Sequence, residues 1–359
     1  MANSGNYEVT IDQRNENQAD IKEWGGNEFS DGATYTIVDS QYRFVCTDPL
    51  NRNKVLDSKD VKIDLYGNKL INFLSDNAGQ NARISKTYFT VASGSTLSII
   101  NTGGDSTASG YPSASTYGFN YSDISNLNSK KIISLAYPSF IVDSGTLNIG
   151  NSDSKAHITV SGCPNIVTPA DGMYRHAAID ITDKGGTVNL FGGVNPINGV
   201  RIQDAVRGIS TMDSAIPGTS LAISSGLNIN INMTNASIIT TGTNAMDNYG
   251  ININGKGKSG RIVINIGGKD PGQSASILSS GSNGSYNNYG IRIVDFKGDI
   301  EINIENGSTI NAGNNGYGIY IDKDCTGNVK ININNTLSIT GKVYIKGVEN
   351  TLSTGTNTY

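Results

Sequence analysis

A short apolar strand that begins with Gly-Ile or Ala-Ile returns along this 359-residue chain and constrains its fold more than any other feature. The copies are AAIDI (177–181), GIS (208–210), GININ (250–254), GIRIV (290–294) and GIYI (318–321). A second strand follows each copy: TVNLF (187–191), LNININ (227–232), RIVINI (261–266), DIEINI (299–304) and NVKINI (328–333). A third, shorter strand follows in the later copies: SII (237–239), SIL (276–278), STI (308–310) and TLSI (336–339).

The head-to-tail order of these strands argues against a meander of hairpins, because each strand best matches its own copy in the next unit. Like strands stacked on like strands form parallel sheets. A chain that lays down three strands per turn and then rises by one strand spacing, about 4.8 Å, is a parallel β-helix. In the second strands apolar residues alternate with polar ones, mostly Asn, so the apolar residues should form the core. The sequence therefore predicts an all-β solenoid.

The N-terminal half repeats a related unit, in YFTVASGSTLSII (88–100) and SFIVDSGTLNIG (139–150). Counting such units up to the last strand, KVYI (342–345), gives roughly nine or ten coils of one solenoid. We predict a single β-helical domain over 33–345, with an insertion loop over 101–130.

Both ends of the chain differ from this pattern. In the segment 1–32, residues 12–26 have the character of an amphipathic helix, with Ile21 and Trp24 on one face and a Gly-Gly stop. We expect this helix to cap the first coil. The segment 346–359 has no apolar alternation and is predicted to be an unstructured tail or the start of a further segment.

Charge and hydropathy argue against two kinds of partner. The formal net charge is −4 and Lys and Arg form no cluster, so we expect no nucleic-acid binding. The chain contains no run of 18 apolar residues, so we expect no membrane span. No signal peptide is visible at the start of the sequence.

Residues that could hold a metal or perform catalysis are few and scattered. Cys46, Cys163 and Cys325 form no metal-ligand spacing, and nothing marks partners for His157 or His176. We therefore predict no metal, no cofactor and no catalytic residue. Carboxylates that could serve a polysaccharide hydrolase are expected to be solvated turn residues instead: Asp180, Asp183, Asp204, Asp213, Asp295, Asp299, Glu301, Asp322 and Asp324.

The SGTLNI and VKIDLYGNKL segments, together with the stacked GIxI strands, resemble the right-handed pectin-lyase-like parallel β-helix. Within that superfamily they are most similar to autotransporter passengers and other bacterial surface adhesins, and to phage spikes. The resemblance spans roughly residues 33–345 and implies a right-handed helix. The enzymes of the superfamily carry clustered acidic residues with Arg or Lys on one sheet, and no motif of this chain matches that cluster.

The candidate ligand-binding residues are two kinds of repeated outward side chain. Tyr249, Tyr289 and Tyr317 each precede the Gly-Ile of a unit, so they should stack along one edge. Asn303 and Asn332 represent the outward asparagines of the second strand. Rings pack on the apolar face of a pyranose and amides bond its hydroxyls, which favours glycan binding. The alternative is an aromatic stack and an asparagine ladder that only stabilise the coils.

These observations predict a non-catalytic rod, extracellular or displayed on the cell surface, that serves adhesion or self-assembly into a layer, filament or trimer. A surface glycan is the expected ligand. The alternative is a carbohydrate-active β-helix, either a phage receptor-binding tailspike on a virion or a polysaccharide lyase or hydrolase.

Overall fold

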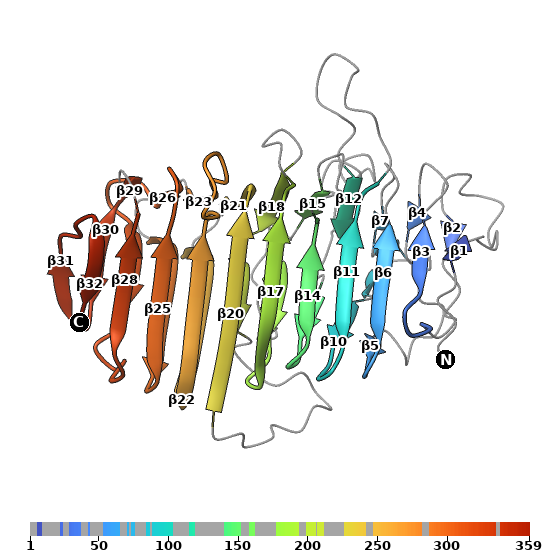
Figure 1. Cartoon of the computed structure of the whole chain (residues 1–359), viewed down its shortest axis with the longest axis horizontal. Helices are drawn as coiled ribbons and strands as arrows, with labels where there is room; N and C mark the ends of the chain where they lie inside the picture. Colours follow the sequence, from blue (N-terminus) through green and yellow to red (C-terminus); the bar gives the residue numbers. More distant parts are fainter. Residues whose placement is uncertain are drawn as a thin grey trace, which may run out of the picture.

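The computed structural model describes residues 6–8, 22–23, 29–36, 42–43, 53–64, 70–71, 73–75, 84–86, 88–102, 115–118, 140–151, 158–161, 177–193, 199–205, 207–211, 226–241, 247–281, 287–334 and 338–359. Every regular element among these residues is a β-strand. Nearly all neighbouring strands pair in parallel, and the strands stand side by side along the long axis of the molecule (Figure 1).

The strands stack into three parallel ladders, which we number in the order in which each unit visits them from β5 on. Ladder 1 contains β5 (Asn53–Leu56), β10 (Tyr88–Val91), β13 (Phe140–Val142), β16 (Ile179–Ile181), β19 (Arg207–Thr211), the first part of β22 (Asn248–Ile266), β24 (Asn288–Phe296), β27 (Tyr317–Ile321) and β30 (Lys342–Ile345). Ladder 2 contains β1 (Asn6–Glu8), β3 (Thr34–Thr36), β6 (Asp60–Asp64), β11 (Thr96–Ile100), β14 (Thr146–Ile149), β17 (Gly185–Phe191), β20 (Gly226–Thr234), the second part of β22, β25 (Asp299–Ile304) and β28 (Val329–Ile333).

Ladder 3 contains β2 (Lys22–Glu23), β4 (Tyr42–Arg43), β7 (Leu70–Ile71), β12 (Ser115–Gly118), β15 (Ile158–Ser161), β18 (Val200–Ala205), β21 (Ala236–Thr240), β23 (Ser276–Ser279), β26 (Thr309–Asn311) and β29 (Ser338–Thr340). From β10 to β29 the chain visits ladders 1, 2 and 3 in strict rotation. The predicted all-β, solenoid-like arrangement of three parallel strands per unit is therefore confirmed.

One apolar core lies inside the three ladders, and its residues stack in columns. The middle column of ladder 2 consists of residues that are at most 1% exposed: Val61, Leu97, Leu147, Val188, Ile231, Ile264, Ile302 and Ile331. Alternation explains the column, since β20 buries every second side chain and turns the asparagines between them outward. Complete burial of one such side chain contributes about 1.5–3 kcal/mol.

The glycine before each Ile of ladder 1 has a steric reason. A Cβ placed on Gly250 would lie 2.3 Å from Cγ2 of Ile277 in ladder 3 and 2.6 Å from the carbonyl oxygen of Gly290. Gly208, Gly290 and Gly318 occupy the same position in their units and meet Ile238, Ile310 and Ile339 in the same way. These glycines thus let ladder 1 approach the isoleucine column of ladder 3.

Three segments differ from the sequence-based predictions. β1 and β2 already pair in ladders 2 and 3, so strands begin before residue 33. Lys22 and Glu23 of the expected capping helix are in β2, and 12–21 lies outside the described residues. The expected insertion loop 101–130 contains β12, a ladder 3 strand whose sequence, STYG, lacks the Ile that marks the later copies.

The prediction of an unstructured tail over 346–359 is wrong. β31 (Val348–Asn350) pairs antiparallel with β30, and β32 (Gly355–Thr358) pairs antiparallel with β28. Leu352, between them, is only 8% exposed and joins the end of the core. The tail covers the last strand edges of ladders 1 and 2. Its strands β31 and β32 need no apolar alternation, because their side chains are largely exposed. The remaining described pair, β8 (Phe73–Ser75) and β9 (Ile84–Lys86), forms a separate antiparallel hairpin.

Replacement of Gly250 by Ala should lower the free energy of unfolding by roughly 1–3 kcal/mol, because the added methyl group overpacks the contact with Ile277. Gly226→Ala is the matched control: it lies in a strand, and its Cβ would have only a backbone oxygen at 3.7 Å. Urea unfolding of both variants measures the difference. Equal midpoints for the two variants would contradict the steric explanation.

Deletion of 346–359 should lower Tm and cause concentration-dependent association, because the parallel edges of β28 and β30 become free to pair with other chains. Light scattering and thermal unfolding measure both effects. Leu352→Ala serves as control, since it keeps the capping strands and should reduce stability without association. A monodisperse deletion variant with an unchanged Tm would show that the tail is no cap.

Candidate functional site

The five predicted ligand-binding residues fall into two rows on different ladders. Tyr249, Tyr289 and Tyr317 occupy one register position at the start of the ladder 1 strands. Asn303 and Asn332 occupy one register position in ladder 2. We call the first set the tyrosine stack and the second, with its neighbours in register, the asparagine row. The residues within each row lie together, as predicted, but the two rows lie on different ladders.

The tyrosine stack has nearly parallel rings. The ring centroids of Tyr249 and Tyr289 are 5.2 Å apart with an interplanar angle of 12°, and those of Tyr289 and Tyr317 are 5.2 Å apart at 9°. Register explains this geometry, because parallel in-register strands place identical side chains one strand spacing apart. Such contacts between rings add about 0.5–1.5 kcal/mol beyond the area they bury.

Two cations occupy the next register positions at the two ends of the stack. Arg207 pairs with Tyr249, and its Cζ lies 5.3 Å from that ring centroid. Lys342 pairs with Tyr317, and its Nζ lies 6.0 Å from that ring centroid. Every ring face in the row therefore meets another ring or a cation. A pyranose has no free tyrosine face in this stack on which to pack, and the geometry favours its stabilising role.

A second aromatic pair extends the stack. Tyr320 and Tyr344 are stacked with a centroid distance of 5.2 Å and an angle of 7°, and Tyr320 meets Tyr317 edge to face at 5.2 Å. Both residues are half-buried and lie on the outward side of ladder 1. Aligning GIYI (318–321) with KVYI (342–345) would have revealed Tyr344.

Burial changes the acidity of two tyrosines. It is the main cause that raises the pKa of Tyr249 to about 12, and the negative charge of Asp247, whose carboxylate accepts a 3.0 Å hydrogen bond from that hydroxyl, adds to the effect. Burial and Asp247 also raise the pKa of Tyr289 to about 12. Arg292 opposes both shifts, with its Cζ 5.6 and 5.8 Å from the two ring centroids.

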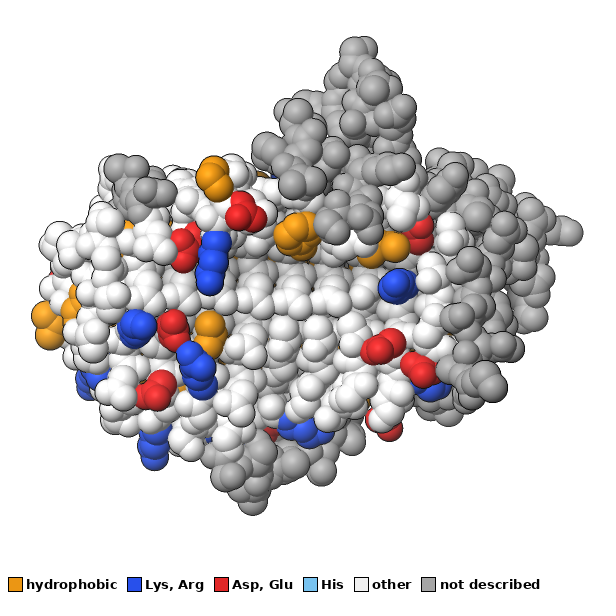
Figure 2. Space-filling model, in the orientation of Figure 1, with side chains coloured by type: hydrophobic (Ala, Val, Ile, Leu, Met, Phe, Trp, Pro, Cys, Tyr) orange, Lys and Arg blue, Asp and Glu red, His pale blue; other side chains and the backbone are white. Residues whose placement is uncertain are grey.

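The asparagine row is one continuous chain of side-chain hydrogen bonds along ladder 2. Each Nδ2 group donates to the residue in the preceding unit, with distances of 2.6–3.1 Å, through Asn148, Asn189, Asn232, Asn265, Asn303 and Asn332. Asn148 donates to Ser98 Oγ at one end, and at the other Asn332 Oδ1 accepts from Thr356 in β32 at 2.8 Å. Figure 2 shows the uncharged side chains of this face as a band along the molecule, with charged residues beside it.

A groove with a volume of about 620 Å³ runs along the C-terminal half of this row. Its floor contains the last four asparagines of the row, and Thr356 of the tail lies at its end. Glu301, Glu305 and Lys269 are the charged residues along its sides. A primary amide offers two donors and two lone pairs, and the row uses one of each in Asn232, Asn265 and Asn303. Asn303 Nδ2 also donates to Oε1 of Glu301 at 3.4 Å, so the ligand would meet its remaining lone pair. The groove can therefore bond neutral hydroxyl groups at regular intervals.

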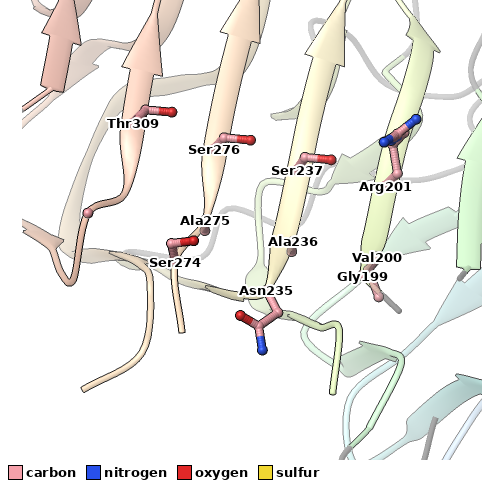
Figure 3. Close-up of a pocket in the computed structure, with 11 residues that line it drawn as sticks. Gly199, Val200, Arg201, Asn235, Ala236, Ser237, Ser274, Ala275, Ser276 and Thr309 are labelled. Carbon is pink, nitrogen blue, oxygen red and sulfur yellow. The ribbon is translucent and has the colours of Figure 1, made fainter. Parts of the chain in front are cut away.

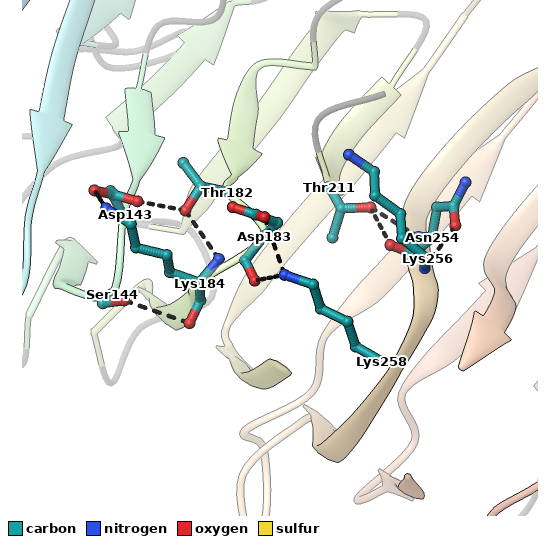
Figure 4. Close-up of polar contacts among 9 residues, drawn as sticks. All are labelled: Asp143, Ser144, Thr182, Asp183, Lys184, Thr211, Asn254, Lys256 and Lys258. Carbon is teal, nitrogen blue, oxygen red and sulfur yellow. Dashed lines mark hydrogen bonds and ion pairs between the residues drawn. The ribbon is translucent and has the colours of Figure 1, made fainter. Parts of the chain in front are cut away.

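Most carboxylates of the described residues form hydrogen bonds or ion pairs with other residues of the fold. Glu301 accepts a 2.6 Å hydrogen bond from Arg261, which is the main cause that lowers its pKa. At the turns between ladders 1 and 2, Lys258 bonds Asp183 at 3.0 Å and Lys184 bonds Asp143 at 2.7 Å (Figure 4). The sequence did not mark Asp143. Asp299 accepts from the backbone and side chain of Asn328.

No group of three or more His, Cys, Asp or Glu side chains is close enough to hold a metal ion within the described ranges. Cys325 is buried, and burial raises the pKa of its thiol. Cys46, Cys163, His157, His176 and Asp213 lie outside the described residues, as do most of the loops that lead into the Gly-Ile strands. In the part of the chain that the structure describes, no helix has the length and apolar character needed to cross a membrane.

Stability should fall as pH rises from 10 toward 12, because Tyr249 and Tyr289 stay neutral in the folded chain while the unfolded chain, with the ordinary pKa of 10.0, loses their protons. Their contribution is complete below pH 10. Urea unfolding across this range measures the loss, which should be smaller in Tyr249→Phe/Tyr289→Phe. Ultraviolet titration of the native chain should show late-ionising tyrosines that are missing in urea. An identical pH dependence for the double variant would refute the assignment.

Comparison with known proteins gives no relative for this chain. No protein-family model matches it, and no curated protein or solved structure matches it. The parallel strand order agrees with a solenoid-like fold and identifies no family.

Proposed function

We propose that the protein is a non-catalytic adhesive rod, extracellular or displayed on a cell surface, that binds a neutral glycan in the groove over the asparagine row. In this proposal the chain forms a single right-handed parallel β-helix of roughly nine or ten coils. Right-handedness is the rule for connections between parallel strands of one sheet, which supports the proposed hand.

The observation that carries the proposal is the unbroken amide row in an open groove. Asn303 and Asn332 are half-buried, so their amides are held by their neighbours yet can contact a ligand. The row repeats one donor and one acceptor every strand spacing, about 4.8 Å. An extended glycan that lies along the rod presents hydroxyl groups at intervals of similar size, which suits such a surface better than a compact ligand does.

Preorganisation favours binding in this groove. Each interior amide is already fixed by two hydrogen bonds, so ligand binding orders few side chains. The tyrosine stack supports the same part of the rod from ladder 1, where Tyr249, Tyr289 and Tyr317 join the coils that carry the groove. We therefore assign the ligand to the asparagines and a stabilising role to the tyrosines.

Glycoside hydrolysis is the second candidate, because Glu301 and Glu305 line the same groove. A hydrolase needs one carboxyl group with a raised pKa as the acid and a second as base or nucleophile. Arg261 lowers the pKa of Glu301, which suits a base or nucleophile and not an acid. The first candidate needs no such acid and is preferred.

Self-association is less favoured than adhesion. The antiparallel strands β31 and β32 cover the C-terminal edges of ladders 1 and 2. End-to-end growth of a filament at this end would require the tail to move. Contacts between the sides of rods, as in a layer or trimer, remain compatible with the proposal, and a solution mass measurement distinguishes them from a monomer.

The double variant Asn303→Ala/Asn332→Ala should lose roughly tenfold or more in affinity on a glycan array, because ligand hydroxyls lose their partners. Asn148→Ala is the matched control: it breaks the same row by one residue but lies outside the groove. Unchanged binding by the double variant would overturn the proposed site. Release of reducing ends from a bound glycan, abolished in Glu305→Gln, would replace adhesion by hydrolysis.

A further inference from the structure

A second concavity lies on ladder 3, on a face distinct from the groove over ladder 2. Its volume is about 250 Å³, and it opens where the strands β18, β21, β23 and β26 begin (Figure 3). Small residues make much of this space, since Gly199, Ala236, Ala275 and Gly307 lie at or just before the strand starts. The volume is below the roughly 300–1,000 Å³ of pockets for drug-sized ligands, so it suits a single sugar ring.

Hydroxyl groups line this concavity at regular intervals. Ser237, Ser276 and Thr309 share one register position of ladder 3, with Arg201 in the preceding unit. All three hydroxyl side chains are half-buried, and they form no hydrogen bond with any other described residue. Each hydroxyl can both donate and accept, so the row can follow the alternating donors and acceptors of a polyol.

A buried acceptor beside this row also lacks a partner. Asn235 is 6% exposed and lines the concavity. Its Nδ2 donates to the carbonyl oxygen of Gly193, which leaves the Oδ1 atom without a hydrogen bond among the described residues. A buried acceptor of this kind destabilises the structure until it meets a donor. A ligand hydroxyl or an ordered water would donate the missing hydrogen bond to Asn235 Oδ1.

Arg201 gives the concavity its charge preference. Its side chain is exposed at one end of the hydroxyl row and forms no ion pair within the described part of the chain. None of the described lining residues is acidic. A guanidinium group binds a carboxylate through two parallel hydrogen bonds, and a neutral hydroxyl less strongly.

We propose that this concavity is a binding site for one carboxylate-bearing sugar unit, with the carboxylate on Arg201 and the ring hydroxyls on Ser237 and Ser276. These three residues come from consecutive units, and register holds them in line, one strand spacing of about 4.8 Å apart. The site is independent of the groove over the asparagine row, which selects for neutral hydroxyls.

Isothermal titration calorimetry and saturation-transfer NMR with glucuronic acid and glucose test this site. Glucuronic acid should bind with roughly tenfold or higher affinity than glucose, reflecting the charge-assisted hydrogen bonds. Arg201→Gln should lower the affinity for glucuronic acid to that for glucose and leave the glucose affinity unchanged. Lys323→Gln, which removes an exposed cation from a turn, is the matched control and should bind both sugars as the native chain does.

Ser276→Leu should abolish binding of both sugars by filling the concavity, with Tm as the check on folding. If this variant unfolds, Arg201→Gln still decides, because its side chain is exposed. Equal affinity for the two sugars, or retention of glucuronic acid binding in Arg201→Gln, would overturn the proposal. Asn303→Ala/Asn332→Ala should retain binding of glucuronic acid here, which separates this site from the proposed adhesive groove.

Discussion

Parallel pairing in constant register is the constraint on which the rest of this structure depends. It places each side chain against its counterpart from the next unit, so the chain can only stack like on like. Inward, this rule produces the isoleucine columns of the core. Outward, it produces the asparagine row and the tyrosine stack. The two candidate surfaces and the hydrophobic core therefore have one physical origin.

Sequence reasoning predicted those parts of the fold that this rule repeats. Alternation in LNININ, RIVINI and DIEINI identified strands, their inward faces and their neighbours, because each copy repeats the same pattern. It failed for strands that do not repeat it. β12 lacks the apolar residues of its ladder, and β31 and β32 pair antiparallel at an edge with largely exposed side chains. Pattern alone cannot find a strand whose only signal is its backbone pairing.

The sequence predicted which residues lie together in the candidate site, but not whether a ligand can reach them. The shared place of Tyr249, Tyr289 and Tyr317 before the Gly-Ile of their units correctly predicted that they lie together. One strand spacing leaves no gap between the rings, however, and the sequence could not show that Arg207 and Lys342 cover the two ends of the stack. Burial to 9% and 8% for the first two tyrosines follows from this arrangement. The hydroxyl concavity on ladder 3 was missed although Ser237 and Ser276 open the repeated third strands SII and SIL, because a repeated serine does not reveal that a cavity lies beside its strand.

The hydrogen bonds of the asparagine row all point the same way along the rod. Every Nδ2 group from Asn148 to Asn332 donates toward the N-terminal end, and every Oδ1 group accepts from the C-terminal side. The amide dipoles are thus aligned in one file, and hydrogen bonds in such a chain polarise one another. A polymer with two chemically different ends would meet the donors and acceptors in opposite order if it were reversed. In the proposed function, the asparagine row would therefore distinguish the polarity of a glycan chain as well as its chemistry.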